Sequence, residues 1–155
     1  MTVNRISLIM LVSQDKDERI TAALPEDCEL HPYDDIRDAV KTLQNIRYDL
    51  IMLDESLFKD KTLALVTELK RRYPYIPLVV ITESQDGMYQ EKLTQAGADD
   101  CITEKLPRKQ FHFHINMLLK QHDRNQALVN LNHNLHLMAS LSQLLYSTSD
   151  SYTLI

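Results

Sequence analysis

The chain contains 155 residues, of which 25% are charged and 44% are apolar, and its formal net charge is −5. These values predict one globular domain with residues to spare, and they argue against nucleic-acid binding, which usually relies on a basic patch. Two isolated cysteines and the lack of a long apolar run or a signal peptide exclude a disulfide framework, a zinc site and a membrane span, so we expect a cytoplasmic protein.

Apolar runs and helical periodicity alternate along the first hundred residues. Five apolar runs predict β-strands, at residues 6–12, 28–33, 48–54, 77–81 and 100–103. Apolar residues at helical spacing predict helices between them, at residues 15–24, from Asp34 or Asp35 to 43, after Asp60 up to 72, and at 85–96. The alternation predicts an α/β protein with a flavodoxin-like fold, in which helices cover both faces of a five-stranded parallel sheet.

The third predicted strand ends on a carboxylate, Asp54. In open α/β sheets, functional groups gather just beyond the carboxyl ends of the strands, so Asp54 is a candidate nucleophile or metal ligand. The chain has only two glycines and therefore no glycine-rich loop to hold a phosphate or a dinucleotide. A flavodoxin-like domain that binds another cofactor stays open as an interpretation.

Three stretches resemble the receiver domain of two-component response regulators. They are residues 49–54 (DLIMLD), 76–82 (IPLVVIT) and 96–100 (AGADD), and the resemblance spans about residues 5–119. It implies that Asp54 is the phosphoacceptor-equivalent residue and that Thr82 is the switch hydroxyl. It also implies a role in a phosphorelay, with a histidine kinase as partner, and a Mg²⁺ ion held by Asp54 and an acidic pair after the first strand.

The acidic pair of that family is missing here. With the frame of the resemblance, its two positions fall on Ser13 and Gln14, and neutral oxygens make a much weaker Mg²⁺ site. Asp15 follows one residue late and is expected to open the next helix. We therefore expect no cofactor and no metal; if Mg²⁺ bound at all, its ligands would be Asp54, Asp15 and Ser56.

The fifth strand departs from the family as well. Glu104 occupies the position of the lysine that pairs with phosphate, and Lys105, one residue later, is expected to point to the opposite face. Cys101 replaces the aromatic residue of the switch, and Glu83 stands where a small residue leaves room for phosphate. These departures predict a degenerate receiver, or pseudo-receiver, that is not an enzyme. The alternative is a phosphoacceptor receiver that is phosphorylated on Asp54 with Mg²⁺.

A helical pattern begins at Pro107 and continues to about residue 146. It contains a heptad series that predicts a coiled coil and a homodimer, formed by Leu128, Leu131, Leu135, Met138 and Leu145. Folding of this helix back onto its own domain is the alternative.

The expected organisation has three parts: a receiver-like domain in 1–120, the helix in 121–146, and in 147–155 a polar tail or the start of a missing domain. We expect the N-terminal part of a larger response regulator, which acts on an effector domain of the same chain or on a separate signalling protein.

Overall fold

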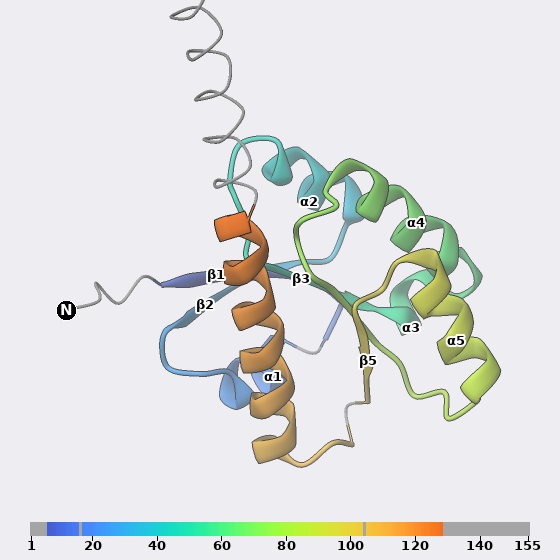
Figure 1. The fold of residues 1–155 in the computed structure, drawn as a ribbon. Coiled ribbons are helices and arrows are strands. Elements are labelled where there is room, and N and C mark those ends of the chain that lie inside the picture. Colours follow the sequence, from blue (N-terminus) through green and yellow to red (C-terminus); the bar gives the residue numbers. More distant parts are fainter. Residues whose placement is uncertain (1–5, 16, 104, 129–155) are drawn as a thin grey trace, which may run out of the picture. The chain divides into compact units, whose positions relative to one another are not determined.

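A computed structural model of the protein describes residues 6–15, 17–103 and 105–128. Within them, five strands form a single parallel sheet in the order β2-β1-β3-β4-β5 (Figure 1). The strands are β1 (Ser7–Val12), β2 (Cys28–Tyr33), β3 (Leu50–Asp54), β4 (Leu78–Ile81) and β5 (Asp100–Ile102). This sheet confirms the predicted flavodoxin-like fold class, and each strand lies within or at the limits of its predicted run.

The helices follow the predicted alternation, with one addition. They are α1 (Asp17–Ala23), α2 (Ile36–Leu43), α3 (Glu55–Phe58), α4 (Thr62–Arg72), α5 (Gly87–Ala96) and the C-terminal helix, of which residues 108–128 are described. The periodicity analysis missed α3 and the 3₁₀ turn η1 (Lys59–Lys61) that follows it, because a single turn is too short to show a 3.6-residue period. The predicted start of α1 at Asp15 is two residues early.

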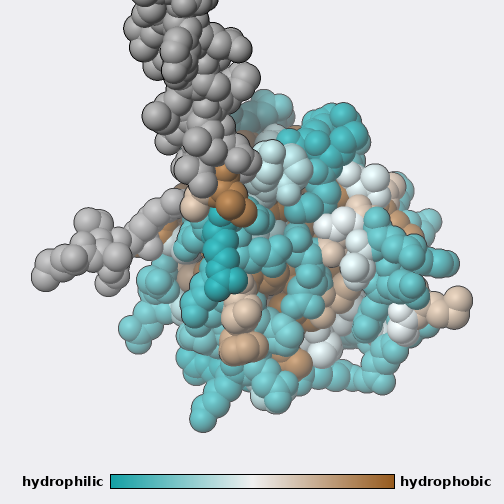
Figure 2. Space-filling model, in the orientation of Figure 1, coloured by the Kyte–Doolittle hydropathy of each residue, from teal (hydrophilic) through white to brown (hydrophobic). Residues whose placement is uncertain are grey.

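Side chains of the strands alternate between two helical layers. One face of the sheet carries Met10, Ile51 and Val80 and packs against α2, α4 and α5 (Figure 1). The other face carries Ile9 and Met52 and packs against α1 and the C-terminal helix. Hydrophilic residues cover most of the surface in the same orientation (Figure 2). Burial on both faces explains why the central strands read as continuous apolar runs instead of alternating ones.

Short polar residues fix the ends of the helices. The Asp35 carboxylate accepts a hydrogen bond from the backbone N–H of Arg37 (2.9 Å), so Asp35 is the N-cap of α2. Asp86 caps α5 in the same way, through the N–H of Met88 at 3.0 Å. Because of this cap α5 begins at Gly87, later than the predicted residue 85.

The chain divides into a compact unit of residues 1–122, which holds the whole sheet, and a second unit of residues 123–155. The predicted boundary at residue 120 stays a prediction. Among the described residues, no helix has the length and apolar character needed to cross a membrane. The predicted seam residues Leu131, Leu135, Met138 and Leu145 lie outside the described residues.

Gly97 ends α5 with a φ of +120°, a conformation that residues with a Cβ rarely adopt. A Cβ there would also lie 2.9 Å from Cγ of Lys70. We predict that Gly97→Ala lowers the free energy of unfolding by about 1–2 kcal/mol in urea denaturation. Gly87→Ala is the matched control, since a Cβ at Gly87 meets nothing within 4 Å, and it should leave stability unchanged or slightly raised. Equal losses in the two variants would contradict this explanation.

Candidate functional site

The Asp54 carboxylate is buried and is held by hydroxyl and amide groups of the chain. Only 1% of its surface is exposed. Ser13 Oγ donates a hydrogen bond to Oδ2 (2.8 Å), and the backbone N–H and Oγ of Ser56 donate to Oδ1 at 3.0 and 2.7 Å. The Ser56 contact makes Asp54 the N-cap of α3, which explains why a helix starts directly after the strand.

The register of the sheet brings Ser13 and Asp54 together. β1 and β3 are parallel neighbours with Val12 opposite Leu53, so the residues that follow these positions lie at the same edge of the sheet. Both residues were expected at the carboxyl ends of predicted strands, and in the structure they form a hydrogen bond. Gln14, the other half of the missing acidic pair, is exposed, and Asp15 lies at the edge of the pocket beside Asp54.

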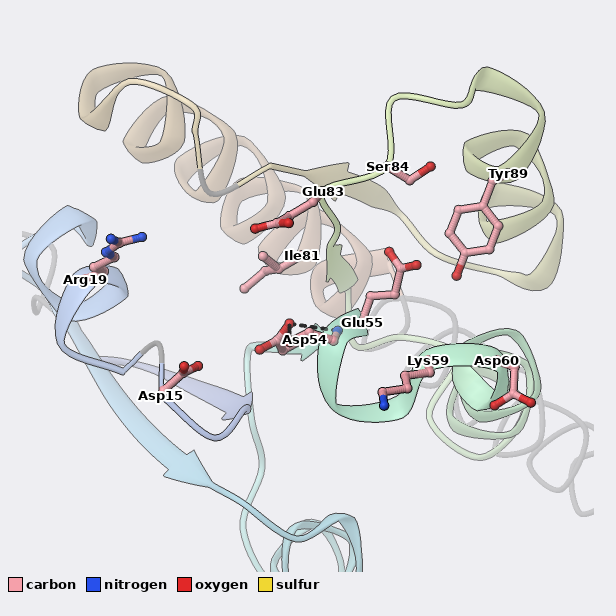
Figure 3. A pocket seen from close by; sticks show the side chains of 11 residues that line it. Asp15, Arg19, Asp54, Glu55, Lys59, Asp60, Ile81, Glu83, Ser84 and Tyr89 are labelled. Carbon is pink, nitrogen blue, oxygen red and sulfur yellow. Dashed lines mark hydrogen bonds between the residues drawn. The ribbon is translucent and has the colours of Figure 1, made fainter.

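An open pocket of about 850 Å³ lies in front of Asp54 (Figure 3). Four segments form it: the start of α1, the turn after β3, the end of β4 with the loop that follows it, and α5. Its lining includes five carboxylates and two cationic side chains, together with Ser56, Ile81, Ser84 and Tyr89: the acids are Asp15, Asp54, Glu55, Asp60 and Glu83, and the cations are Arg19 and Lys59. The pocket is therefore acidic at neutral pH.

Glu55 adds to this acidity from a half-buried position. Its Oε2 is buried and has no hydrogen-bond partner in the described part of the chain. Burial, and then the negative charge of Glu55, raise the pKa of Tyr89, so the tyrosine stays neutral and faces the pocket with its hydroxyl (Figure 3). A carboxylate oxygen left without a donor next to Asp54 disfavours further negative charge in the pocket.

Thr82 and Cys101, the two predicted switch residues, line a smaller cavity of about 130 Å³, which shares the lining residue Ser84 with the Asp54 pocket. Thr82 is buried, and its Oγ1 accepts a hydrogen bond from the backbone N–H of Ser84 (3.0 Å). Burial raises the pKa of the Cys101 thiol to about 11, with further contributions from Asp100 and Glu55, so the thiol is protonated at neutral pH. The structure therefore brings Thr82 and Cys101 together, and neither of them is among the residues that line the Asp54 pocket.

Of the two candidates for the phosphate-pairing position after the fifth strand, the structure describes Lys105. Lys105 is exposed and does not line the Asp54 pocket, and its backbone N–H donates to Thr103 Oγ1 at 3.3 Å. Glu104 lies outside the described residues. Lys59 and Tyr89 also line the pocket, although neither is among the predicted site residues. Lys59 follows the end of β3 closely enough for the strand-end rule to have found it, whereas Tyr89 reaches the pocket from inside α5 and gives no local signal.

The acidic residues do not gather into a site for a divalent cation. No group of three or more His, Cys, Asp or Glu side chains with metal-binding geometry exists among the described residues. Ser13 offers Asp54 a hydroxyl hydrogen where the resemblance implies a carboxylate, and a hydrogen-bond donor opposes a cation at the same oxygen. The residues present therefore do not fit the Mg²⁺ ion that the resemblance implies.

Comparisons with known proteins agree with the observed fold. A family model, the response regulator receiver domain, matches residues 9–116. No curated protein matches the chain. The signal receiver domain of an HD domain-containing protein from Pseudomonas fluorescens Pf-5 is 18% identical, with a TM-score of 0.69 over 81% of this chain and 96% of its own.

Two further solved structures are similar. The signal receiver domain of a signal transduction histidine kinase from Syntrophus aciditrophicus is 26% identical, with a TM-score of 0.62 over 74% of this chain and 90% of its own. The beryllofluoride-activated NtrC4 receiver domain dimer is 17% identical, with a TM-score of 0.66 over 74% of this chain and 98% of its own. At identities this low, the NtrC4 and Pseudomonas structures support the fold alone.

Lys59 carries backbone strain at the rim of the pocket. Its φ of 51° and ψ of −120° form a combination that favours glycine. We predict that Lys59→Gly raises the free energy of unfolding by about 1 kcal/mol in urea denaturation, because glycine adopts this conformation without strain. Lys61→Gly is the matched control: its φ is −86°, so the same change should lower stability. A lower free energy of unfolding in Lys59→Gly would show that the backbone at Lys59 is not strained.

Proposed function

The chain belongs to the response regulator receiver domain family, and we propose that it is a degenerate receiver whose signalling does not depend on phosphorylation of Asp54. Receiver domains are regulatory modules of signal transduction and not enzymes of the usual kind. The observation that carries the proposal is the state of the Asp54 carboxylate, which accepts hydrogen bonds from Ser13 and Ser56 while almost fully buried.

Phosphorylation of Asp54 would have to break these contacts. The attacking oxygen must leave its hydrogen-bond donors and approach a phosphoryl group, and hydrogen bonds to the ionised form of a carboxylate make it a poorer nucleophile. Catalysis of phosphoryl transfer otherwise consists mainly of positioning and of positive charge, supplied by metal ions and basic groups. Ser13 supplies a neutral hydroxyl where the resemblance implies a carboxylate that would hold such a metal ion.

The charge of the pocket acts in the same direction. Glu55, Asp60, Glu83 and Asp15 surround Asp54, against Arg19 and Lys59, so an incoming phosphoryl group would meet a net negative field. Lys105, the candidate for pairing with phosphate, is exposed and outside the pocket lining. These features favour a receiver fold that has kept Asp54 for its role as the cap of α3.

The output is proposed to pass through the C-terminal helix. This helix packs on the sheet through Phe111, Ile115 and Leu118, so its first turns are part of the receiver core. Leu128, the first residue of the predicted heptad seam, is 57% exposed and is available to a second copy of the chain. We propose a homodimer through this helix, with an effector in the same chain or a separate signalling partner. The NtrC4 receiver, itself a dimer in its solution structure, supports dimerisation as a capacity of the fold.

Exposure to beryllofluoride with Mg²⁺ separates this proposal from the rival phosphoacceptor function. We predict that ¹⁹F NMR detects no bound beryllofluoride in the wild-type protein, because the acidic pocket and the Ser13 hydroxyl oppose both ions. The double variant S13D/Q14D restores the two carboxylates that the family resemblance implies, and it should bind Mg²⁺ at least about tenfold more tightly than the wild type.

A stable beryllofluoride or acetyl-phosphate adduct in the wild type, lost in Asp54→Asn, would overturn the proposal in favour of the phosphoacceptor. The S13D/Q14D variant also serves as a positive control for the reagents. Circular dichroism of each variant establishes that a negative result does not come from unfolding.

The dimer is tested on the full chain by size exclusion with light scattering over a concentration series. We predict a dimer for the wild type and a monomer for the variant L131D/L135D, because two charges in a heptad seam are poorly solvated in the paired helices. Gln143→Asp, outside the seam positions, is the control and should stay dimeric. A monomeric wild type at the highest concentrations would contradict dimerisation.

A further inference from the structure

A second carboxylate precedes β3 at the opposite end from Asp54, and it forms a buried pair with a histidine. Asp49 Oδ1 lies 3.2 Å from Nε2 of His122, which belongs to the C-terminal helix, and the two side chains are 4% and 5% exposed. The other oxygen of Asp49 accepts the backbone N–H of Leu8 in β1 at 2.8 Å. His122 Nδ1 lies 3.1 Å from the backbone carbonyl oxygen of Tyr75, in the connection between α4 and β4.

Both ring nitrogens of His122 therefore face acceptors. A carbonyl oxygen cannot donate, so Nδ1 must carry a hydrogen. A neutral imidazole would then present the bare lone pair of Nε2 to a carboxylate oxygen, which is repulsive. One more proton removes the repulsion, whether it resides on Nε2 or on the Asp49 carboxyl, because the two groups titrate as a pair. The number of protons that the pair holds is the same in either case.

We propose that Asp49 and His122 form a buried proton-binding site that fastens the C-terminal helix to the start of β3 when it holds this proton. The site joins four segments: β1 through Leu8, the residue before β3, the α4–β4 connection through Tyr75, and the helix itself. This inference does not depend on whether Asp54 accepts a phosphoryl group, and it gives the helix proposed for output a second input, pH.

Other ionisable groups lie on the elements that pack against the pair. On β2, Cys28 stays protonated because burial, then Asp27 and then Asp49 raise its pKa to about 11. On α4, Lys70 donates to the backbone oxygens of Pro74 and Ile76, on either side of Tyr75, and is paired with Asp99 at 3.0 Å. On the C-terminal helix, Lys120, Asp123 and Arg124 are exposed, and so is Glu29 of β2.

The direction of the pH dependence follows from the proton count. In the unfolded chain a histidine loses its proton near pH 6.5, whereas the folded pair holds its proton to a higher pH. Below about pH 6.5 the stabilisation is fully present. Above that value the folded state binds one proton more than the unfolded state, so stability falls as the pH rises through the titration of the pair. The helix should release from the sheet at high pH, not at low pH.

The titration can be observed directly in the full-length wild type by ¹H–¹⁵N NMR of the histidine rings. We expect the His122 ring to titrate with a midpoint above about 6.5, the value for a histidine in an unfolded chain. A His122 midpoint at or below 6.5, or a ring without the additional proton throughout pH 6–9, would overturn the proposal. This measurement needs no substitution, so it stays decisive if the variants fold poorly.

Thermal unfolding tests the consequence for stability. At pH 6, His122→Gln should lower the melting temperature by about 10 °C, because it leaves a buried carboxylate without its partner. The difference in melting temperature between the wild type and His122→Gln should shrink as the pH rises to 9. His114→Gln is the matched control on the same helix, since His114 pairs with Asp100 at a partly exposed position (40% and 31%) and should give a small gap. A His122→Gln gap that is constant across this pH range would contradict proton binding.

Discussion

The burial of β3 between two layers of helices is the constraint on which the rest of the structure depends. All five of its residues are buried, and it lies between β1 and β4 at the centre of the sheet. Helices pack closely on both faces of this strand, so only apolar side chains of suitable size fit there. This requirement determines where β3 lies in the sheet. The parallel register of its neighbours then decides which residues meet at each end. A carboxylate lies at both ends, Asp49 and Asp54, and the two have acquired different partners.

At the carboxyl end of β3, hydroxyl groups of the chain surround the Asp54 carboxylate. The hydroxyls of Ser13 and Ser56 donate hydrogen bonds to the two oxygens of the buried Asp54 carboxylate. The same arrangement caps α3, so Asp54 has a structural role even without phosphate chemistry. Thr82 lines a neighbouring cavity, and its hydroxyl accepts a hydrogen bond from the backbone of Ser84.

At the opposite end, Asp49 contacts the C-terminal helix through His122. Hydrophobic packing of Phe111, Ile115 and Leu118 holds the helix on the sheet, but such contacts are not directional. The ion pair and the hydrogen bond to Tyr75 are directional, so they define the position of the helix along its own axis. Desolvation offsets much of the attraction within a buried ion pair, but removal of one partner leaves a buried charge uncompensated and is therefore costly. The buried His122–Asp49 pair therefore holds the helix that we propose carries the output. A change in the protonation of this pair would act directly on that helix.

The sequence by itself determined the fold class and the strand that ends at Asp54, because these depend on periodicity and on caps that act within a few residues. Asp35 and Gly97 are examples, each fixing a helix end through its nearest neighbours. The resemblance to the receiver family was carried by three short motifs. The single turn of α3 was too short for any period to reveal. Only the tertiary structure decided that Ser13 donates to Asp54 and that His122 pairs with Asp49, since those contacts depend on the register of strands and the packing of a distant helix. Local patterns cannot encode which residues meet across the sheet, and the chemistry of both sites depends on that.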